Sequence, residues 1–451
     1  MTHKLLTAVC ALALVLSFSF SATAAVQNVK VGGDIEVKGI WQNNYDVTLD
    51  SDDQVVHDYL MTTTRLYVEA SLTDNVSAMV RLLNDRDWDS DATGATDVEL
   101  DLAYLTLSDM YGYPVSLTIG RQELLYGEGF LVGDGVRFDG GADTYQYGAR
   151  KAFDAIKAVW NYDPHQIDLF VAKIAEGSNI APGATQWIDR DGDGAVDAGE
   201  QTGPLNNDMD LYGINWNYDG GMYGLWDVGL FYFTRDVELS EGRTDITSLS
   251  VRGEASLPQV EVGTLVLKGE IVKQWGNLEP VFTATPDKEI LNAWGGYVEA
   301  EYTFDNVYAP YLGLGYIYMS GDDDDTDDVE TFQPMYEDEK YGEIAEVVYG
   351  GLDTSITNAS IWKLSAGVNP TENTALDLTY YSLRADRVAI DDQNKYIGAE
   401  YDLSFTYNYS EDVSFGLMYA LFVPGKFFAQ GVDNVNLENA QELLGSVKVT
   451  F

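Results

Sequence analysis

Residues 394–425 read NKYIGAEYDLSFTYNYSEDVSFGLMYALFVPG, and their pattern decides the fold class. Apolar and polar side chains alternate along the first half of this stretch. The alternation puts these side chains on one face: Ile397, Ala399, Tyr401, Leu403, Phe405 and Tyr407. The three residues SED at 410–412 then separate a second alternating run, 413–421. Alternation with period two on both sides of a tight connection predicts two antiparallel β-strands.

The same alternation recurs along the chain, as in TTTRLYVEASL at 62–72 and TSLSVRGEASL at 247–257. Gly, Asp, Asn and Pro separate the runs, and no helical periodicity of any length is found. The pattern predicts about eighteen strands. Their starts are expected near residues 29, 58, 74, 97, 113, 153, 165, 208, 223, 245, 260, 290, 307, 358, 372, 394, 412 and 441.

Strands with one apolar and one charged face fit either a soluble sandwich or a membrane barrel. The connections alternate between short ones and long ones such as 176–207 and 321–357, as in porin-type barrels with long outer loops. Tyrosine and tryptophan gather at strand ends, and the chain ends GSVKVTF with an aromatic residue. The sequence therefore predicts an all-β fold, a transmembrane antiparallel β-barrel with long acidic extracellular loops.

The amino terminus predicts export. MTHK, an apolar run LLTAVCALALVLSFSF and the small residues SATAA have the form of a secretory signal peptide over residues 1–25. The barrel domain is then expected over 26–451. Cys10 is the only cysteine and lies in the signal peptide, which excludes a disulfide framework and a cysteine zinc site.

Charge and histidine content exclude several functions. The net charge is −47, with 26 basic and 73 acidic residues, which argues against a nucleic-acid partner. His57 and His165 are the histidines that follow the signal peptide, and neither lies in a recognisable nucleophile pattern, so no enzyme activity is expected. GRQELLYGEG at 120–129 lacks a phosphate-loop lysine, which argues against a nucleotide site.

DRDGDGAVDAGE at 189–200 has the spacing of a twelve-residue calcium loop, with Gly194 at the turn position. The predicted calcium ligands are Asp189, Asp191, Asp193, Ala195 through its carbonyl, Asp197 and Glu200. Pro182 and Pro204 exclude flanking EF-hand helices, so a bound ion would stiffen an extracellular loop. The alternative is a solvated acidic turn. GDDDDTDD at 321–328 is a second acidic cluster, either a hydrated outer loop or a loose site for a divalent ion.

Several segments resemble the alginate-export family of outer-membrane barrels. They are VSLTIGRQELLYGEGFLVGDGVRFDG at 115–140, FDAIKAVW at 153–160, YMSGDDDDTDDVETFQPMYEDEKYG at 318–342 and the terminal strands with FVPG at 422–425. The resemblance implies a bacterial outer-membrane porin of eighteen strands, in contact with outer-membrane lipid. It also implies an alternative function, export of an anionic polysaccharide through an arginine-lined constriction.

Strand alternation, with two loop arginines, predicts which charged residues line the pore. They are Arg65, Glu69, Arg81, Arg121, Arg137, Arg252, Glu254, Lys268, Glu299, Glu301, Glu400 and Asp402. On the strand faces, which also carry Asp101, Lys157, Glu270, Lys363 and Asp377, acid outnumbers base. This balance favours passive passage of cations or neutral, saccharide-like small solutes over anions. Each charged pair also has a structural interpretation as a cross-strand contact. A structural or adhesive barrel with calcium-stiffened loops is a further alternative, and the sequence leaves the oligomeric state open.

Overall fold

The computed structural model describes most of the chain. The described residues are 28–45, 47, 56–88, 98–133, 152–175, 207–221, 224–237, 243–258, 262–278, 289–323, 325–326, 328–350, 356–388, 394–429 and 437–451. The predicted signal peptide (1–25), Arg137 and the predicted calcium loop (189–200) lie outside these residues.

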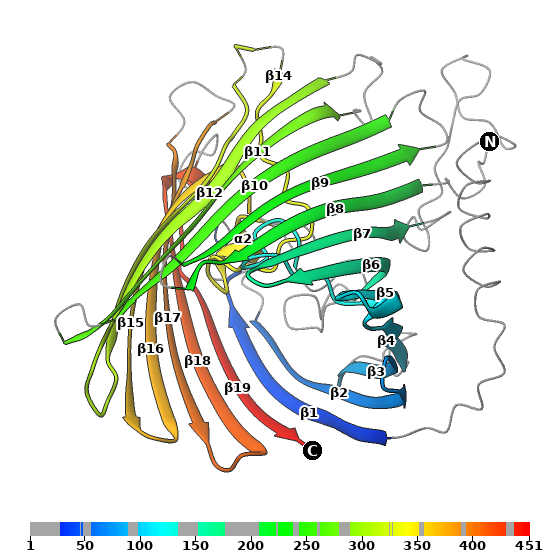
Figure 1. The fold of residues 1–451 in the computed structure, drawn as a ribbon. Coiled ribbons are helices and arrows are strands. Elements are labelled where there is room, and N and C mark those ends of the chain that lie inside the picture. The colour runs from blue at the N-terminus through cyan, green and yellow to red at the C-terminus, as the bar shows by residue number, and fades with distance from the viewer. Residues whose placement is uncertain are drawn as a thin grey trace, which may run out of the picture.

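The described chain forms one antiparallel sheet that closes on itself (Figure 1). Its strands are β1 (Asn28–Asn43), β2 (Val56–Thr73), β3 (Val76–Asp87), β4 (Glu99–Leu107), β5 (Val115–Gln122), β6 (Phe153–Tyr162), β7 (His165–Ala175), β8 (Asn207–Asp219), β9 (Leu225–Val237), β10 (Arg243–Pro258), β11 (Gly263–Leu278), β12 (Glu289–Phe304), β13 (Tyr311–Met319), β14 (Asp328–Val329), β15 (Ala359–Thr371), β16 (Thr374–Ala385), β17 (Tyr396–Asn408), β18 (Val413–Pro424) and β19 (Ala440–Thr450). The short helices are η1 (Met110–Gly112), α2 (Ala345–Val348) and η3 (Lys426–Ala429).

Closure joins the first strand to the last. β1 pairs antiparallel with both β2 and β19, and Figure 1 shows β1 and β19 side by side. At the end of the chain, the N–H groups of Gly33 and Phe451 each donate to the carbonyl of the other at 2.9 Å. Every backbone group of the outer wall can therefore find a partner within the sheet, as a wall in lipid requires.

β14 has two residues and pairs parallel with β12 at the rim, so eighteen strands make the wall. The predicted number and the closed barrel are confirmed. The largest difference between a predicted and an observed strand start is four residues, between 307 and Tyr311. Within the described residues, no helix is both apolar enough and long enough to span a membrane.

The outer face is apolar, as the alternation predicts. Leu364 on β15 and Leu378 on β16 are 48% and 45% exposed, while their neighbours along each strand point inward. The prediction was wrong for Ile397, which is fully buried in the interior cluster. The register shifts between Leu383 and Arg384 opposite this residue, and such a bulge turns one extra side chain to the other face.

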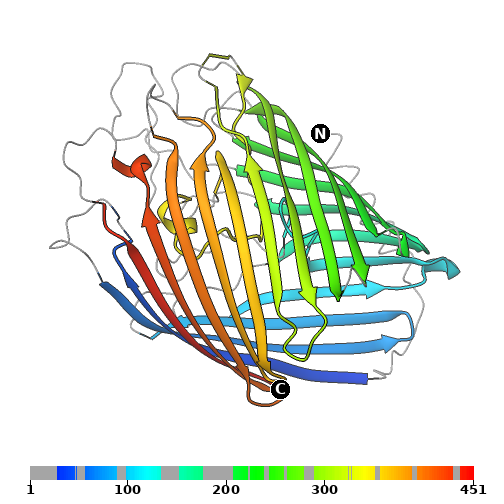
Figure 2. The same ribbon diagram turned by 90° about the vertical axis from the view of Figure 1, so that its left-hand side faces the viewer.

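Two segments fold into the barrel instead of extending from its rim. They are the inner loop 123–133, which follows β5, and the second inner loop 330–350, which contains α2. Both views show α2 inside the wall (Figures 1 and 2). Buried apolar residues of both loops, such as Leu124 and Ile344, join one cluster with inward side chains of the wall. The lumen is therefore narrowed by packed chain, and the path that remains is set by these loops.

Candidate functional site

The inner loop 123–133 turns sharply around Glu128. Gly129 N–H donates to the Tyr126 carbonyl at 3.1 Å, and Tyr126 N–H donates to the Val132 carbonyl at 3.0 Å. Gly127 and Gly129, on either side of Glu128, have φ of +61° and +80°, a left-handed backbone that glycine adopts without steric cost. The glycines thus present the Glu128 side chain at the tip of a tight turn.

The same glycines let the loop touch the wall. A Cβ added at Gly127 would lie 2.9 Å from Cδ of Arg252 on β10. One added at Gly129 would lie 2.8 Å from Cβ of Asp338 in the second inner loop. Any larger residue at either position would push the turn away from the wall or from the other loop.

Aromatic packing fixes the direction of the inner loop. The Tyr126 ring stacks on Phe170 of β7 with centroids 5.3 Å apart, and lies 5.5 Å from Phe231 of β9. Phe130 packs at 5.7 Å from Tyr297 of β12. Aromatic pairs at this spacing stabilise packing beyond the area that they bury. The loop is thereby held along the wall from β7 to β12.

Backbone hydrogen bonds join the two inner loops. Gly133 N–H donates to the Tyr336 carbonyl at 2.6 Å, and Tyr336 N–H donates to the Leu131 carbonyl at 2.9 Å. Asp338 N–H donates to the Gly129 carbonyl at 2.8 Å. The two loops therefore form one unit inside the barrel.

Glu400 of β17 anchors the second inner loop to the wall. Its carboxylate accepts from the N–H groups of Ile344 at 2.8 Å and Ala345 at 2.7 Å, and the side chain is fully buried. Asp402, two residues further along the same face, accepts a hydrogen bond from the backbone of Glu343. These two acids, predicted to line the pore, hold the loop that narrows it.

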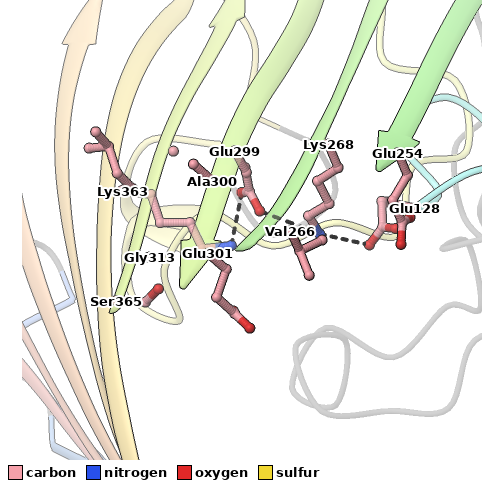
Figure 3. A pocket seen from close by; sticks show the side chains of 12 residues that line it. Glu128, Glu254, Val266, Lys268, Glu299, Ala300, Glu301, Gly313, Lys363 and Ser365 are labelled. Atoms are coloured by element: carbon pink, nitrogen blue, oxygen red, sulfur yellow. Dashed lines mark hydrogen bonds and ion pairs between the residues drawn. The ribbon is translucent and has the colours of Figure 1, made fainter. Parts of the chain in front are cut away.

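Five alternating charges cross the lumen wall beside the inner loop, and Figure 3 shows four of them: Glu128, Lys268, Glu299 and Lys363. Arg252 of β10 lies 2.8 Å from the Glu128 carboxylate, and Lys268 of β11 lies 3.1 Å from it. Lys268 also lies 3.4 Å from Glu299 of β12, which lies 3.1 Å from Lys363 of β15. We call these five residues the constriction chain. Each charged side chain of the constriction chain is held in position by its neighbours. Both positive and negative side chains therefore face the solute path.

Arg252 is the most enclosed member of the chain, at 6% exposed. Besides Glu128, it lies 3.1 Å from Asp227 and 2.6 Å from Glu254, and its Nε–H donates to the Tyr297 hydroxyl at 3.3 Å. A guanidinium has five N–H donors, and this one directs them at three carboxylates and a phenol. Its charge is fully compensated by the protein.

A cavity of about 250 Å³ opens beside the chain. Its lining residues are Glu128, Glu254, Val266, Lys268, Glu299, Ala300, Glu301, Gly313, Leu314, Gly315, Lys363 and Ser365. Four glutamates and two lysines among them leave a net negative lining. Gly313 and Gly315 place no side chain on β13 there, and the side chains of Ser365, Glu299 and Lys363 occupy the space next to these glycines. Figure 3 shows Glu301 below the chain, and no ion pair to Glu301 is found within the described residues.

Two loop carboxylates near the chain have opposite pKa shifts. Burial works to raise the pKa of Glu128, but Lys268 and Arg252 together hold it below its ordinary value of 4.5. For Glu339, in the second inner loop, burial raises the pKa above 4.5, and nearby Lys363 and Lys268 offset this only in part. Glu128 therefore stays ionised in mild acid, whereas Glu339 takes up a proton at a higher pH than an ordinary glutamate.

The structure brings five of the predicted pore residues together: Arg252, Glu254, Lys268, Glu299 and Glu301. Several others lie on distant strands. Arg65 pairs with Asp34 at 3.1 Å, Glu69 with Lys30 at 3.4 Å, and Arg81 with Asp101 and Glu123.

Arg121 lies away from the constriction. Its guanidinium is 3.1 Å from Asp154, which shares a strand face with Ile156, 48% exposed on the outer wall. The prediction that Arg121 lines the pore therefore differs from the structure. Gly120, at φ +122°, directly precedes this arginine.

Three charged residues of the site were not predicted from the sequence: Glu128, Asp227 and Glu339. Asp227 stands in an alternating run, so strand parity could have found it. Glu128 had one signal, a carboxylate between two glycines within the apolar stretch LLYGEGFLV at 124–132. A charged residue in such a stretch indicates a loop that is buried and needs a partner.

A closed eighteen-stranded sheet with an apolar outer face, a charged lumen and loops folded into that lumen defines a porin-type channel of the outer membrane. Residues 28–440 match the family model described as alginate export. The chain belongs to the alginate export family, as its resemblance implied, and is a channel of the bacterial outer membrane.

Solved structures share the fold. OccAB2 of Acinetobacter baumannii superposes with a TM-score of 0.59 at 10% identity, covering 95% of this chain and 99% of that one. OccK2 (OpdF) of Pseudomonas aeruginosa, solved in complex with glucuronate, gives 0.55 at 12% identity and covers 94% and 99%. OccK11 (OpdR) of Pseudomonas aeruginosa gives 0.53 at 11% identity and covers 93% and 96%. No curated protein matches the sequence. The family and these neighbours are transport proteins and not enzymes.

Proposed function

We propose that this chain is a passive channel for small solutes that passes cations and neutral, saccharide-like molecules more readily than anions. One observation carries the proposal: the constriction cavity has four glutamates against two lysines, and both lysines are paired with carboxylates. A net negative constriction lowers the free energy of a cation and raises that of an anion. Glutamate oxygens and lysine ammonium groups also offer acceptors and donors to the hydroxyl groups of a neutral sugar.

The proposal includes no catalytic step. Its side chains need only exchange water for solute contacts and release the solute on the other side. The cavity of about 250 Å³ has room for a solute of monosaccharide size. Passage of a longer saccharide requires that it move end-on between the inner loops and the wall.

Reversal potentials in planar bilayers test the selectivity. The purified channel in a tenfold KCl gradient is expected to give a reversal potential with the same sign as the potassium equilibrium potential. A neutral hexose is expected to enter proteoliposomes faster than protein-free vesicles. A reversal potential of the chloride sign would reject the cation preference and would support conduction of an anionic polysaccharide.

We also propose that the 189–200 loop binds one calcium ion and that this ion has a structural role. The ligand spacing of the sequence supports the proposal, because six oxygen ligands at these positions suit calcium. Calorimetric titration of the full chain in detergent tests it. Absence of binding heat at millimolar calcium would leave the solvated acidic turn as the interpretation.

A further inference from the structure

Glu128 has an unusual position among the charges of the constriction. The other four members of the chain stand on wall strands, and Glu128 alone is brought by the inner loop. Its carboxylate accepts from Arg252 Nη2 at 2.8 Å through one oxygen and from Lys268 Nζ at 3.1 Å through the other. Cations on two neighbouring strands thus converge on one carboxylate that reaches them from the lumen side.

That is the direction from which a solute would approach. An anionic group entering the cavity would meet Lys268 at the position that the Glu128 carboxylate occupies (Figure 3). Arg252 lies 2.8 Å from the same position. Glu128 lines the cavity and is 29% exposed at its side chain, so the site that it fills is open to the solute path.

Removal of Glu128 would leave the wall cations unequally compensated. Arg252 would retain Asp227 and Glu254. Lys268 and Lys363 would share Glu299 as their ion-pair partner, at 3.4 and 3.1 Å, with the Glu339 carboxyl also nearby. Two lysines that share one ion-paired carboxylate at the edge of the cavity form a place for an anion.

We propose that Glu128 is the specificity-determining residue of this channel and acts as a built-in substitute for an anionic solute. The inner loop supplies its own carboxylate to the wall cations, and an organic anion can bind there only when this carboxylate is absent or displaced. The inference rests on the proposed function, since it explains how a wall with three paired cations rejects anions.

The pair of variants Glu128→Gln and Glu301→Gln tests the inference. Both remove one negative charge from the same cavity, but Glu301 has no ion pair among the described residues. The measurement is block of the KCl current by citrate in planar bilayers at pH 7.5. Heat-modifiable mobility on gels shows that each variant has assembled its barrel.

Citrate is expected to block E128Q at a concentration about tenfold or more below that needed for the wild type, the ratio for one regained charge-assisted hydrogen bond. E301Q is expected to need the wild-type concentration. Adding Lys268→Met to E128Q removes a partly buried cation and is expected to reverse the gain. Equal citrate block of E128Q and E301Q, or block of E128Q that survives K268M, would overturn the inference.

A third variant serves if E128Q does not assemble. Lys268→Met alone removes one of the two ion-pair partners of Glu128. It is expected to shift the reversal potential further toward the potassium equilibrium potential. An unchanged reversal potential, or a shift in the opposite direction, counts against the inference. The proposed function fails on a different result, a chloride-signed reversal potential of the wild type without citrate. The two failures are therefore distinguishable.

Discussion

Replacing Glu400 by alanine tests the idea that one side chain of the wall holds the loop that narrows the pore. Its carboxylate accepts the N–H groups of Ile344 and Ala345 at 2.8 and 2.7 Å in a fully buried site. Alanine offers neither acceptor. Both N–H groups would lose their partner while the second inner loop stays in place.

The cost follows from the two lost bonds. A buried backbone donor left without a partner costs about 1–3 kcal/mol, so the docked loop loses roughly 2–6 kcal/mol. A change of about 1.4 kcal/mol is tenfold, so the ratio of docked to released loop falls by roughly 30-fold to 20,000-fold. Lumen water can hydrate the freed groups, which favours the lower end. Glu400→Gln keeps one acceptor oxygen and should lie between the wild type and E400A.

Single-channel recording measures the result. E400A is expected to show a larger and noisier conductance than the wild type, with E400Q intermediate, because the loop leaves the solute path. Glu442→Gln is the matched control, since Glu442 is an equally buried carboxylate on β19 that accepts from Gln42 and Tyr45 instead of from this loop. If assembled E400A conducts like the wild type, the anchoring role is refuted.

Three more variants test the second inner loop and the predicted calcium loop. Gly342→Ala places a Cβ against the Glu400 carboxylate, so it should raise conductance as E400A does, and an unchanged conductance would contradict the close packing. Burial raises the pKa of Glu339, so its charge is lost at a higher pH than that of an ordinary glutamate. Cation preference should therefore weaken in mild acid, and this pH dependence of the reversal potential should be smaller in Glu339→Gln. Calorimetry should show calcium binding by the full chain that Asp193→Asn weakens at least about tenfold, as expected for loss of one charged ligand.

The strand arrangement could be predicted from the sequence because a barrel wall in lipid requires apolar and polar side chains to alternate. A wall residue faces either hydrocarbon or the lumen, so Tyr401 and Leu403 alternate with Glu400 and Asp402 without long-range information. The alternation fails to predict the orientation of Ile397. A register shift turned one side chain inward, and alternation contains no signal for a shift of one residue.

The constriction was predictable only in its wall. Lys268 and Glu299 were placed on the lumen face by strand parity, and the antiparallel register then set them opposite each other. Their partner Glu128 was not predicted, because a loop has no period and its path depends on contacts remote in sequence. Tyr126 finds Phe170 and Phe231, and only the closed barrel brings those rings within reach.

A sheet of alternating faces, its number of strands and its location all follow from local side-chain chemistry, so they can be predicted from the sequence. Which charges meet depends on the folded chain. Glu128 and Lys268 are 140 positions apart in the sequence, and Glu400 and Ile344 are 56 apart. Pairing of that kind is fixed by closure of the sheet and by packing of the inner loops, which no local pattern encodes.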